Sequence, residues 1–211
     1  MIFGAGKGAT GKVSKETPAI VTRHSSGLEQ FHSMLHGSED LSILDMSGAS
    51  QANITFVTGA GHRISSDDLI GTMQQIFGDN FLEGQQTPEK AKRFLELALT
   101  FPDATFDGAL VWDALQFLVS PVLDETVAQL LRVVRPGGLI LAFFNANEKI
   151  AQIPVYSHRI QDAKTIAQVP RGGMQPAQHF NNRNLEKLFE HATSIKFFLT
   201  RDNLREVIVR R

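Results

Sequence analysis

Two short apolar segments constrain the fold of this chain most strongly. Residues 106–112 and 139–144 are apolar along nearly their whole length and are too short to be typical helices. Between them, residues 124–134 place Val127, Leu130, Leu131 and Val134 on one helical face. A strand that is apolar on both faces must be covered on both faces, which is typical of a parallel sheet between helices. The sequence therefore predicts an α/β domain with a doubly wound, mostly parallel sheet and helices on both faces.

The same reasoning assigns the other elements. Helical periodicity or helix-capping residues predict helices at 25–36, 51–57, 69–77, 87–99 and 185–191. Strands are predicted at 41–46, 62–66, 194–200 and 204–210. The last two are joined by the turn-forming residues Arg201, Asp202 and Asn203 and are expected to form a C-terminal antiparallel hairpin. Residues 78–105 are expected to be loop, helix and loop, with Asn80–Leu82 as the sole candidate for a strand.

The ends of the chain differ in character. Residues 1–20 are rich in Gly and Lys and lack apolar periodicity, so we expect a flexible tail there. Residues 21–211 are expected to form a single domain. No internal repeat divides this part of the chain.

Composition limits the classes of function. The 211 residues include no cysteine, which excludes disulfides, thiolate metal ligands and cysteine nucleophiles. Lys and Arg total 21 against 22 for Asp and Glu, giving a net charge of -1. Nucleic-acid binding as a main activity is not expected, because it needs a basic surface. No apolar run is long enough to cross a membrane and the N-terminus lacks a signal-peptide core, so a cytoplasmic protein is expected, with no membrane partner.

Three segments resemble S-adenosyl-L-methionine (SAM)-dependent methyltransferases, in order and spacing. Residues 43–51, Ile-Leu-Asp-Met-Ser-Gly-Ala-Ser-Gln, stand where that family has a strand followed by a glycine-rich loop. Residues 106–113, which begin Phe-Asp-Gly-Ala, resemble the family's Phe-Asp-x-Val strand, and residues 130–139, which contain Arg-Pro-Gly-Gly, resemble its helix–turn–strand segment. The resemblance covers roughly residues 25–144, and the terminal hairpin extends it. It implies a Rossmann-like fold with the cofactor at the carboxyl ends of the parallel strands.

The resemblance also implies a set of cofactor-binding residues. The loop would hold the methionine part of SAM, the acidic residue after the second strand would hold the ribose, and the end of the 106–112 strand would lie near the sulfonium. Carried onto this sequence, these positions are Asp45, Ser47, Gly48, Ala49, Gln51, Asp67, Trp112 and Asp113. Asp67 and Asp113 also have a structural interpretation, because each precedes a predicted helix that it could cap.

The loop departs from the family pattern. Ser47, Ala49 and Gln51 occupy the three glycine positions, and Gly48 falls between them. Glycine lets the backbone turn sharply and lets a cofactor approach without a Cβ in the way. Two hypotheses follow, a SAM-dependent methyltransferase acting on an unidentified small molecule, and a non-catalytic protein that uses the same fold as a binding scaffold. A nicotinamide-dependent dehydrogenase fits less well, because neither the Arg-Pro-Gly-Gly segment nor the hairpin is expected there.

Three other features have weaker functional interpretations. Residues 6–12 resemble a phosphate-binding loop, but Val13 stands where a hydroxyl is needed and no strand precedes the loop. His32 and His36 have metal-ligand spacing without an evident third ligand, so no metal is expected. The Gly- and Pro-rich segment 170–183 is interpreted as a lid, an interface or a simple connector. The sequence specifies neither a substrate nor an oligomeric state.

Overall fold

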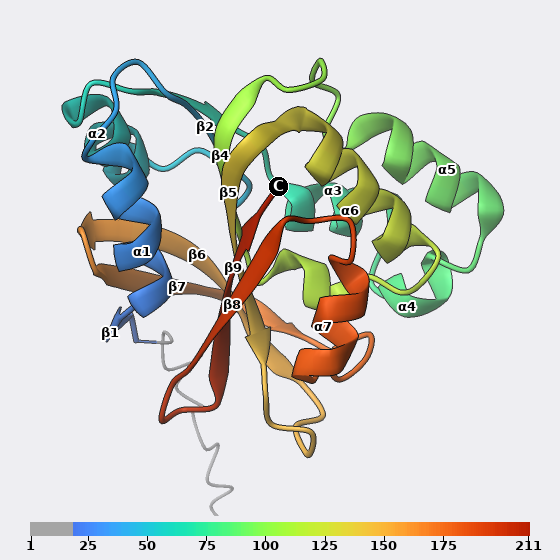
Figure 1. Cartoon of the computed structure of the whole chain (residues 1–211). Helices are drawn as coiled ribbons and strands as arrows, with labels where there is room; N and C mark the ends of the chain where they lie inside the picture. Colours follow the sequence, from blue (N-terminus) through green and yellow to red (C-terminus); the bar gives the residue numbers. More distant parts are fainter. Residues whose placement is uncertain (1–18) are drawn as a thin grey trace, which may run out of the picture.

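The computed structural model describes residues 19–211, and two β-sheets organise them (Figure 1). A six-stranded sheet has the order β3-β2-β4-β5-β9-β8, and a three-stranded sheet has the order β1-β7-β6. The strands are β1 (Val21–His24), β2 (Ser42–Asp45), β3 (Arg63–Ser66), β4 (Phe106–Trp112), β5 (Val134–Asn145), β6 (Ile153–Asp162), β7 (Thr165–Met174), β8 (Ser194–Leu199) and β9 (Leu204–Arg210). The predicted tail and the loop at residues 6–12 lie outside the described residues, apart from positions 19 and 20.

The larger sheet has the predicted architecture. Strands β3, β2, β4 and β5 pair in parallel, and β9 and β8 continue the sheet in antiparallel pairing. Every residue of β4 is buried, which explains its continuous apolar sequence. The C-terminal hairpin and the mostly parallel sheet are thus confirmed.

Helices cover both faces of this sheet (Figure 1). They are α1 (Ser26–Leu35), α2 (Gln51–Gly59), α3 (Leu69–Phe77), α4 (Phe81–Gly84), α5 (Pro88–Leu97), the short 3-10 helix η1 (Ala114–Phe117), α6 (Val122–Val133) and α7 (Asn182–Leu188). Helices α1 and α2 pack on one face with Phe31 and Val57, and helices α3 to α7 bury a larger core on the other. The predicted helix starts are real, since Ser25 accepts a hydrogen bond from Leu28 N and Pro88 follows Thr87 in the first turn of α5.

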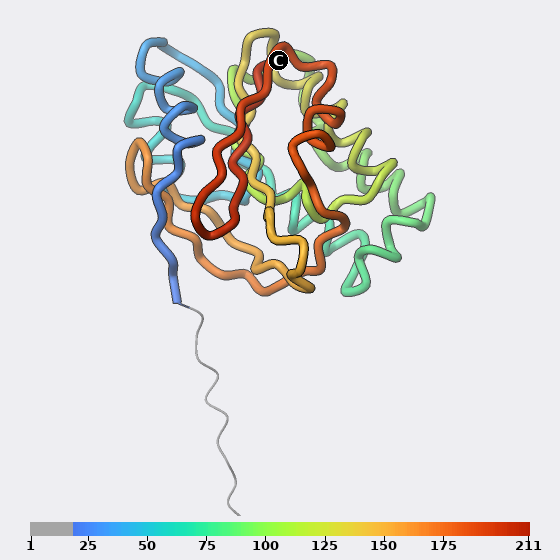
Figure 2. The backbone as a smooth tube through the Cα atoms, turned by 60° about the horizontal axis from the view of Figure 1, so that its bottom comes forward, coloured from blue at the N-terminus to red at the C-terminus, as the bar shows by residue number. Residues whose placement is uncertain are grey.

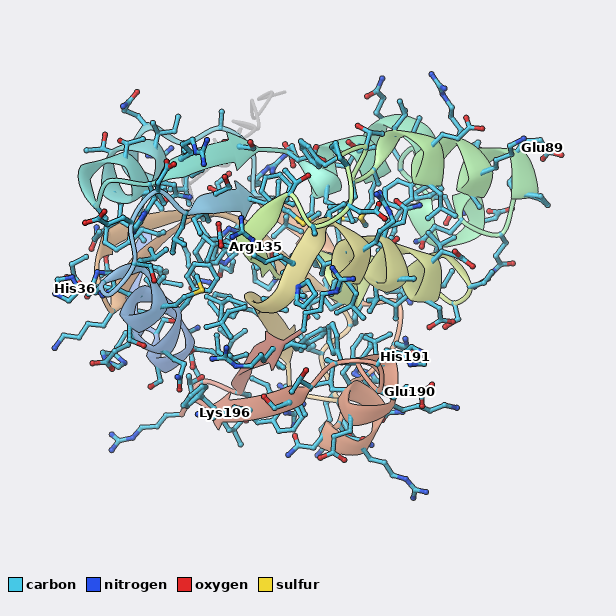
Figure 3. All side chains as sticks on the ribbon, turned by 45° about the horizontal axis from the view of Figure 1, so that its top comes forward. His36, Glu89, Arg135, Glu190, His191 and Lys196 are labelled. Carbon is cyan, nitrogen blue, oxygen red and sulfur yellow. The ribbon has the colours of Figure 1, made fainter. Side chains whose placement is uncertain are left out.

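The Arg-Pro-Gly-Gly segment lies inside β5 rather than before it. Helix α6 ends at Val133, and β5 pairs with β4 at Val134 before the register shifts and pairing resumes at Leu139. Gly137 has φ 82°, a left-handed conformation that favours glycine. The Arg135 guanidinium reaches back to Asp107 Oδ1 at 2.6 Å, on the molecular surface seen in Figure 3. The segment stops the helix as expected and also forms an irregular start to the strand.

The smaller sheet was not predicted. Strands β6 and β7 form an antiparallel hairpin whose edge is extended by β1, and the hairpin crosses the carboxyl ends of the parallel strands (Figures 1 and 2). Residues 170–174, interpreted from sequence as part of a lid, an interface or a connector, belong to β7. Register shifts between Val155 and Tyr156 and between Ile160 and Asp162 interrupt the alternation of buried and exposed residues. These bulges hide the period of two by which a strand is recognised in sequence.

The sheet of the described residues ends at β3, with no further strand beyond it. Residues 80–82 were the sole candidate for a strand within residues 78–105, and they lie at the start of α4 instead. Side chains on the periphery, including those of Glu89, Glu190 and Lys196, point outward (Figure 3). Among the described helices, none combines the length and apolar character needed to span a membrane.

Candidate functional site

Asp45 is the centre of the carboxyl edge of the sheet. It ends β2 and is fully buried, yet its carboxylate has four hydrogen-bond donors. Oδ1 accepts from Ser47 N at 3.1 Å, Ser47 Oγ at 3.0 Å and Trp112 Nε1 at 2.8 Å, and Oδ2 accepts from Asn53 Nδ2. Burial raises the pKa of Asp45, and the hydrogen bonds from Asn53, Trp112 and Ser47 oppose that shift. In this arrangement Asp45 fixes the loop after β2 to the end of β4.

Asp67 joins this network through its backbone. Its N–H donates to the Asp45 carbonyl at 2.8 Å, and its carbonyl accepts from Gly48 N at 2.8 Å. Its half-buried carboxyl accepts from Asp68 N at 2.8 Å, and burial raises its pKa. Capping of α3 falls to Asp68, whose Oδ1 accepts from Gly71 N. Asp67 is therefore beside the loop, with its carboxyl engaged by its own neighbouring backbone.

The loop between β2 and α2 lines a cavity. Gly48 has φ 85°, so the single glycine in the loop stands where the backbone turns into the left-handed region. Ser47, Gly48, Ala49 and Gln51 line a cavity of about 290 Å³ together with Ser157 and Arg159 from β6. The exposed Gln51 side chain turns along its own helix and donates to Thr55 Oγ1 at 3.1 Å. The Gln51 side chain therefore lies along α2 at the wall of this cavity.

Trp112 and Asp113 lie at the end of β4. Trp112 has φ 57°, an uncommon conformation for a non-glycine residue that is more frequent at functional sites. The His158 ring of β6 stacks on its indole with a centroid separation of 4.8 Å and an interplanar angle of 2°. Burial raises the pKa of Asp113 to about 7 and lowers the pKa of His158 to about 3, so His158 is neutral at physiological pH. His158 Nδ1 and Asp113 Oδ1 are 3.9 Å apart, too far for a hydrogen bond.

Strand β6 passes between the loop and Asp113. Because side chains alternate along a strand, Ser157 and Arg159 face the loop cavity, whereas Tyr156 and His158 face a second cavity of about 240 Å³ that Asp113 lines. Asp67 lines neither cavity. Sites for drug-sized ligands measure about 300–1,000 Å³. As the side chains stand, the loop residues line one cavity and Asp113 lines the other, and Asp45, Asp67 and Trp112 line neither, so neither cavity fits a whole nucleoside cofactor.

Two contacts fix the hairpin over this edge. Asn53 of α2 donates to the His158 carbonyl at 2.9 Å and accepts from Ile160 N at 2.7 Å. Arg171 of β7 forms a bidentate pair with Asp68, at 2.9 Å from Nη1 to Oδ1 and 2.7 Å from Nη2 to Oδ2. The sequence analysis did not single out any of these residues. Asn53 had one detectable signal, a polar residue on the inner face of a predicted helix.

The remaining candidates are unrelated to this edge. The rings of His32 and His36 stack with a centroid separation of 5.6 Å, and His36 points outward (Figure 3). Within residues 19–211 no group of three or more His, Asp or Glu side chains is arranged to hold a metal ion. His62 is buried and bonds to the backbone at Leu41 and Leu35, so it has a structural role.

Comparison with known proteins agrees with the fold. Residues 49–142 match the family model described as a methyltransferase domain. A SAM-dependent methyltransferase structure from Archaeoglobus fulgidus is 11% identical, covers 87% of this chain and 91% of its own, and has a TM-score of 0.50. No curated protein matches the chain.

Two other solved structures have similar coverage. A SAM-dependent methyltransferase from Methanosarcina mazei is 14% identical, with 85% of this chain and 96% of its own covered and a TM-score of 0.49. The 1,6-didemethyltoxoflavin-N1-methyltransferase of Burkholderia thailandensis, solved with its substrate and S-adenosylhomocysteine, is 15% identical, with coverages of 89% and 79% and a TM-score of 0.47. The family match and the Archaeoglobus fulgidus structure show that this chain has the α/β fold of SAM-dependent methyltransferases.

Proposed function

We propose that this protein is a SAM-dependent methyltransferase that acts on a small molecule and binds its cofactor after the β6–β7 hairpin has moved. The observation that supports it is the family match over residues 49–142, which includes Ala49 and Gln51 of the loop, Asp67 and the end of β4. In this fold the cofactor supplies the reactive methyl group, and the protein supplies orientation and a dry pocket. The loop residues Ser47, Gly48, Ala49 and Gln51 would contact the methionine part, Asp67 the ribose, and Asp45, Trp112 and Asp113 would complete the site.

The hairpin must move because β6 lies between the loop cavity and Asp113. One of the contacts that hold the hairpin in place is weak. The Arg171–Asp68 pair is accessible to solvent, with side chains 24% and 37% exposed. Arg171 also stands in a bulge, because Val155 pairs with Gly172 and Tyr156 with Pro170, which leaves Arg171 without a partner in the ladder. A solvent-exposed ion pair on an irregular strand contributes about 0–1 kcal/mol, so it is a contact that a ligand can replace.

The test is a titration with S-adenosylhomocysteine. Trp112 is the only tryptophan in the chain, and His158 covers it, so its emission should shift to the red as the hairpin leaves. Binding should also raise the melting temperature, because a ligand that binds the native state stabilises it by about 2.7 kcal/mol at 100 times its Kd. Arg171→Ala should bind about two- to fivefold more tightly, since the pair no longer opposes opening.

Lys164→Ala is the control, because Lys164 is an exposed cation at the turn of the same hairpin, lines neither cavity and has no ion pair among the described residues. Its hairpin should open as in the unchanged protein. Absence of any shift in melting temperature at millimolar ligand, in both Arg171→Ala and the unchanged protein, would contradict the proposal.

The second candidate is a non-catalytic protein that keeps the fold as a scaffold. The observation that favours it is the complete set of donors around Asp45, which leaves its carboxylate satisfied by protein groups. On this hypothesis the hairpin is a permanent part of the fold, Trp112 emission is unchanged by S-adenosylhomocysteine, and binding by the outer face of the hairpin is the function.

A further inference from the structure

The cavity of about 240 Å³ beneath the hairpin contains two buried donors without an acceptor. His158 is fully buried, and its Nδ1 has no hydrogen-bond partner among residues 19–211. The same holds for Arg23 Nε. Both residues line this cavity, together with Asp113 and Tyr156. Buried polar atoms are rarely left unpaired, because desolvation without a new hydrogen bond is costly.

We propose that this cavity binds a small planar compound through a carbonyl or carboxylate oxygen that accepts hydrogen bonds from His158 and Arg23. The inference goes beyond the proposed function, because this cavity exists with the hairpin in place, whereas the cofactor is proposed to bind after the hairpin has moved. Binding itself needs no cofactor.

The hydrogen bonds of the histidine identify its free atom as a donor. The Gln168 amide nitrogen lies 3.3 Å from His158 Nε2. An amide nitrogen donates, so Nε2 accepts and the ring proton of the neutral histidine is on Nδ1. Nδ1–H therefore needs an acceptor, and Asp113 is too distant to provide one.

The arginine contributes a second donor that is fixed in place. Arg23 Nη1 and Nη2 bind the Asp202 carboxylate at 2.9 and 3.1 Å, and Nη2 also bonds to Thr200 Oγ1 at 3.1 Å. These contacts hold the guanidinium plane and leave Nε free. A planar donor held in this way suits a planar oxygen acceptor.

The walls of the cavity favour a flat ligand, and its two unpaired donors favour an oxygen acceptor. Phe143, Tyr156 and Leu204 provide aromatic and apolar surface around the two donors. The volume lies below the usual range for drug-sized ligands, which suits a compound with one ring. At pH 6, Asp113 is mostly protonated and Asp202 is paired with Arg23. An ammonium group beside His158 and Arg23 would then meet donors where it needs acceptors, and the site would discriminate against it.

The probes are benzoate, benzamide and benzylamine, which share a ring and differ in the polar group. We expect benzoate and benzamide to bind the full chain in calorimetric titrations and benzylamine to bind at least about tenfold more weakly, because it offers no acceptor oxygen to the buried donors. In His158→Phe, which keeps a ring over Trp112, affinity for benzamide should fall about tenfold. Arg159→Ala, on the opposite side of β6, should bind like the unchanged protein.

A pH series separates the two ligands that bind. Burial raises the pKa of Asp113 to about 7, so the residue gains charge as the pH rises from 6 to 8. Benzoate should then bind more weakly and benzamide should be unaffected. The other charged or titratable groups near Asp113 are His158 and Tyr156 of β6, Arg171 of β7, Arg23 of β1 and Asp202 of the β8–β9 turn.

The outcomes distinguish this inference from the proposed function. Equal affinity for benzylamine and benzamide, or unchanged affinity in His158→Phe, overturns the inference. Should His158→Phe not fold, the ¹⁵N shift of His158 Nδ1 in the unchanged protein decides, since it must move on saturation with benzamide. Benzamide binding without any response to S-adenosylhomocysteine overturns the methyltransferase proposal and leaves the ligand site supported.

Discussion

Strands β4 and β5 meet the β6–β7 hairpin at the carboxyl edge of the sheet, and the two regions use different interactions. All seven residues of β4 are buried, and the strand packs in the apolar cores on both faces of the sheet. Beneath the hairpin, several of the buried groups are polar, including Asp45, Asn53, Asp113, His158 and Gln168. Apolar packing is insensitive to pH and to ligands, whereas buried polar groups respond to both. The first region therefore supports the fold, and the second has the properties of a functional site.

The largest expected effect lies in the apolar region. Phe144 of β5 is fully buried and packs against Phe180 with a ring separation of 4.8 Å. Phe144→Ala should lower the free energy of unfolding by about 3–5 kcal/mol, through lost burial and the cavity left behind. Urea denaturation measures it. Leu199→Ala is the control, because Leu199 is 66% exposed and its loss should change stability by less than about 0.5 kcal/mol. Equal effects of the two variants would contradict the assignment of the core.

The polar region should show its strongest effect at Asn53. Asn53→Ala leaves Asp45 Oδ2, the His158 carbonyl and the Ile160 N–H without this partner. The expected loss is about 2–3 kcal/mol, because unpaired buried polar groups keep their desolvation cost. Gln51→Ala on the same helix removes only an exposed hydrogen bond to Thr55 and should be nearly neutral. The idea that Asn53 fixes the hairpin would be wrong if both variants unfolded at the same urea concentration.

Two variants should separate the pH responses of the polar region. Asp113 has a pKa raised from 3.8 to about 7, so its contribution to stability is complete below pH 4 and is lost as the pH rises towards 7. His158 has a pKa lowered from 6.5 to about 3, so its contribution is complete above pH 6.5 and is lost as the pH falls towards 3. In the unchanged protein these two trends oppose each other between pH 4 and 6.5.

Removing one group should expose the trend of the other. Relative to the unchanged protein, the free energy of unfolding of His158→Phe should fall by ~2 kcal/mol as the pH rises from 4 to 6.5. That of Asp113→Asn should rise by ~2 kcal/mol over the same interval. Melting temperatures measured across the interval provide the check. Slopes of the same sign in the two variants would show that these groups are not buried as described.

The smallest expected effect is that of the hairpin ion pair. Arg171→Ala and Asp68→Asn, the second of which keeps a capping side chain for α3, should be coupled by about 0.5–1 kcal/mol. A double-mutant cycle in urea measures this energy, and added salt should reduce it. A coupling that is unchanged by salt would argue against a solvent-exposed pair.

Local pattern predicted much of the larger sheet. The continuous apolar run of β4, the helical face of α6 and the turn at Arg201–Asn203 each identify an element within a few residues. The hairpin of β6 and β7 escaped prediction because two bulges shift the phase of its buried positions. Strand β1 escaped because four mostly exposed residues carry no periodic signal.

The candidate site was predictable only in part. The residues named from the family resemblance do gather at one edge, and Asp45, Ser47 and Trp112 share one hydrogen-bond network, although their cofactor role stays a prediction. The contact between Asn53 and the His158 carbonyl joins residues 105 positions apart. No local pattern encodes such a contact, because it depends on where the hairpin folds back.

The sequence by itself determined the alternation of apolar strands and helices, because periodic burial leaves its mark on neighbouring residues. It also determined that helix α6 ends at the Arg-Pro-Gly-Gly segment, where Gly137 has a left-handed conformation. Only the tertiary structure decided that β6 divides the carboxyl edge into two cavities and places His158 over Trp112. Burial and hydrogen-bond pairing at that edge depend on segments distant in the chain, and these interactions set the protonation states of Asp113 and His158.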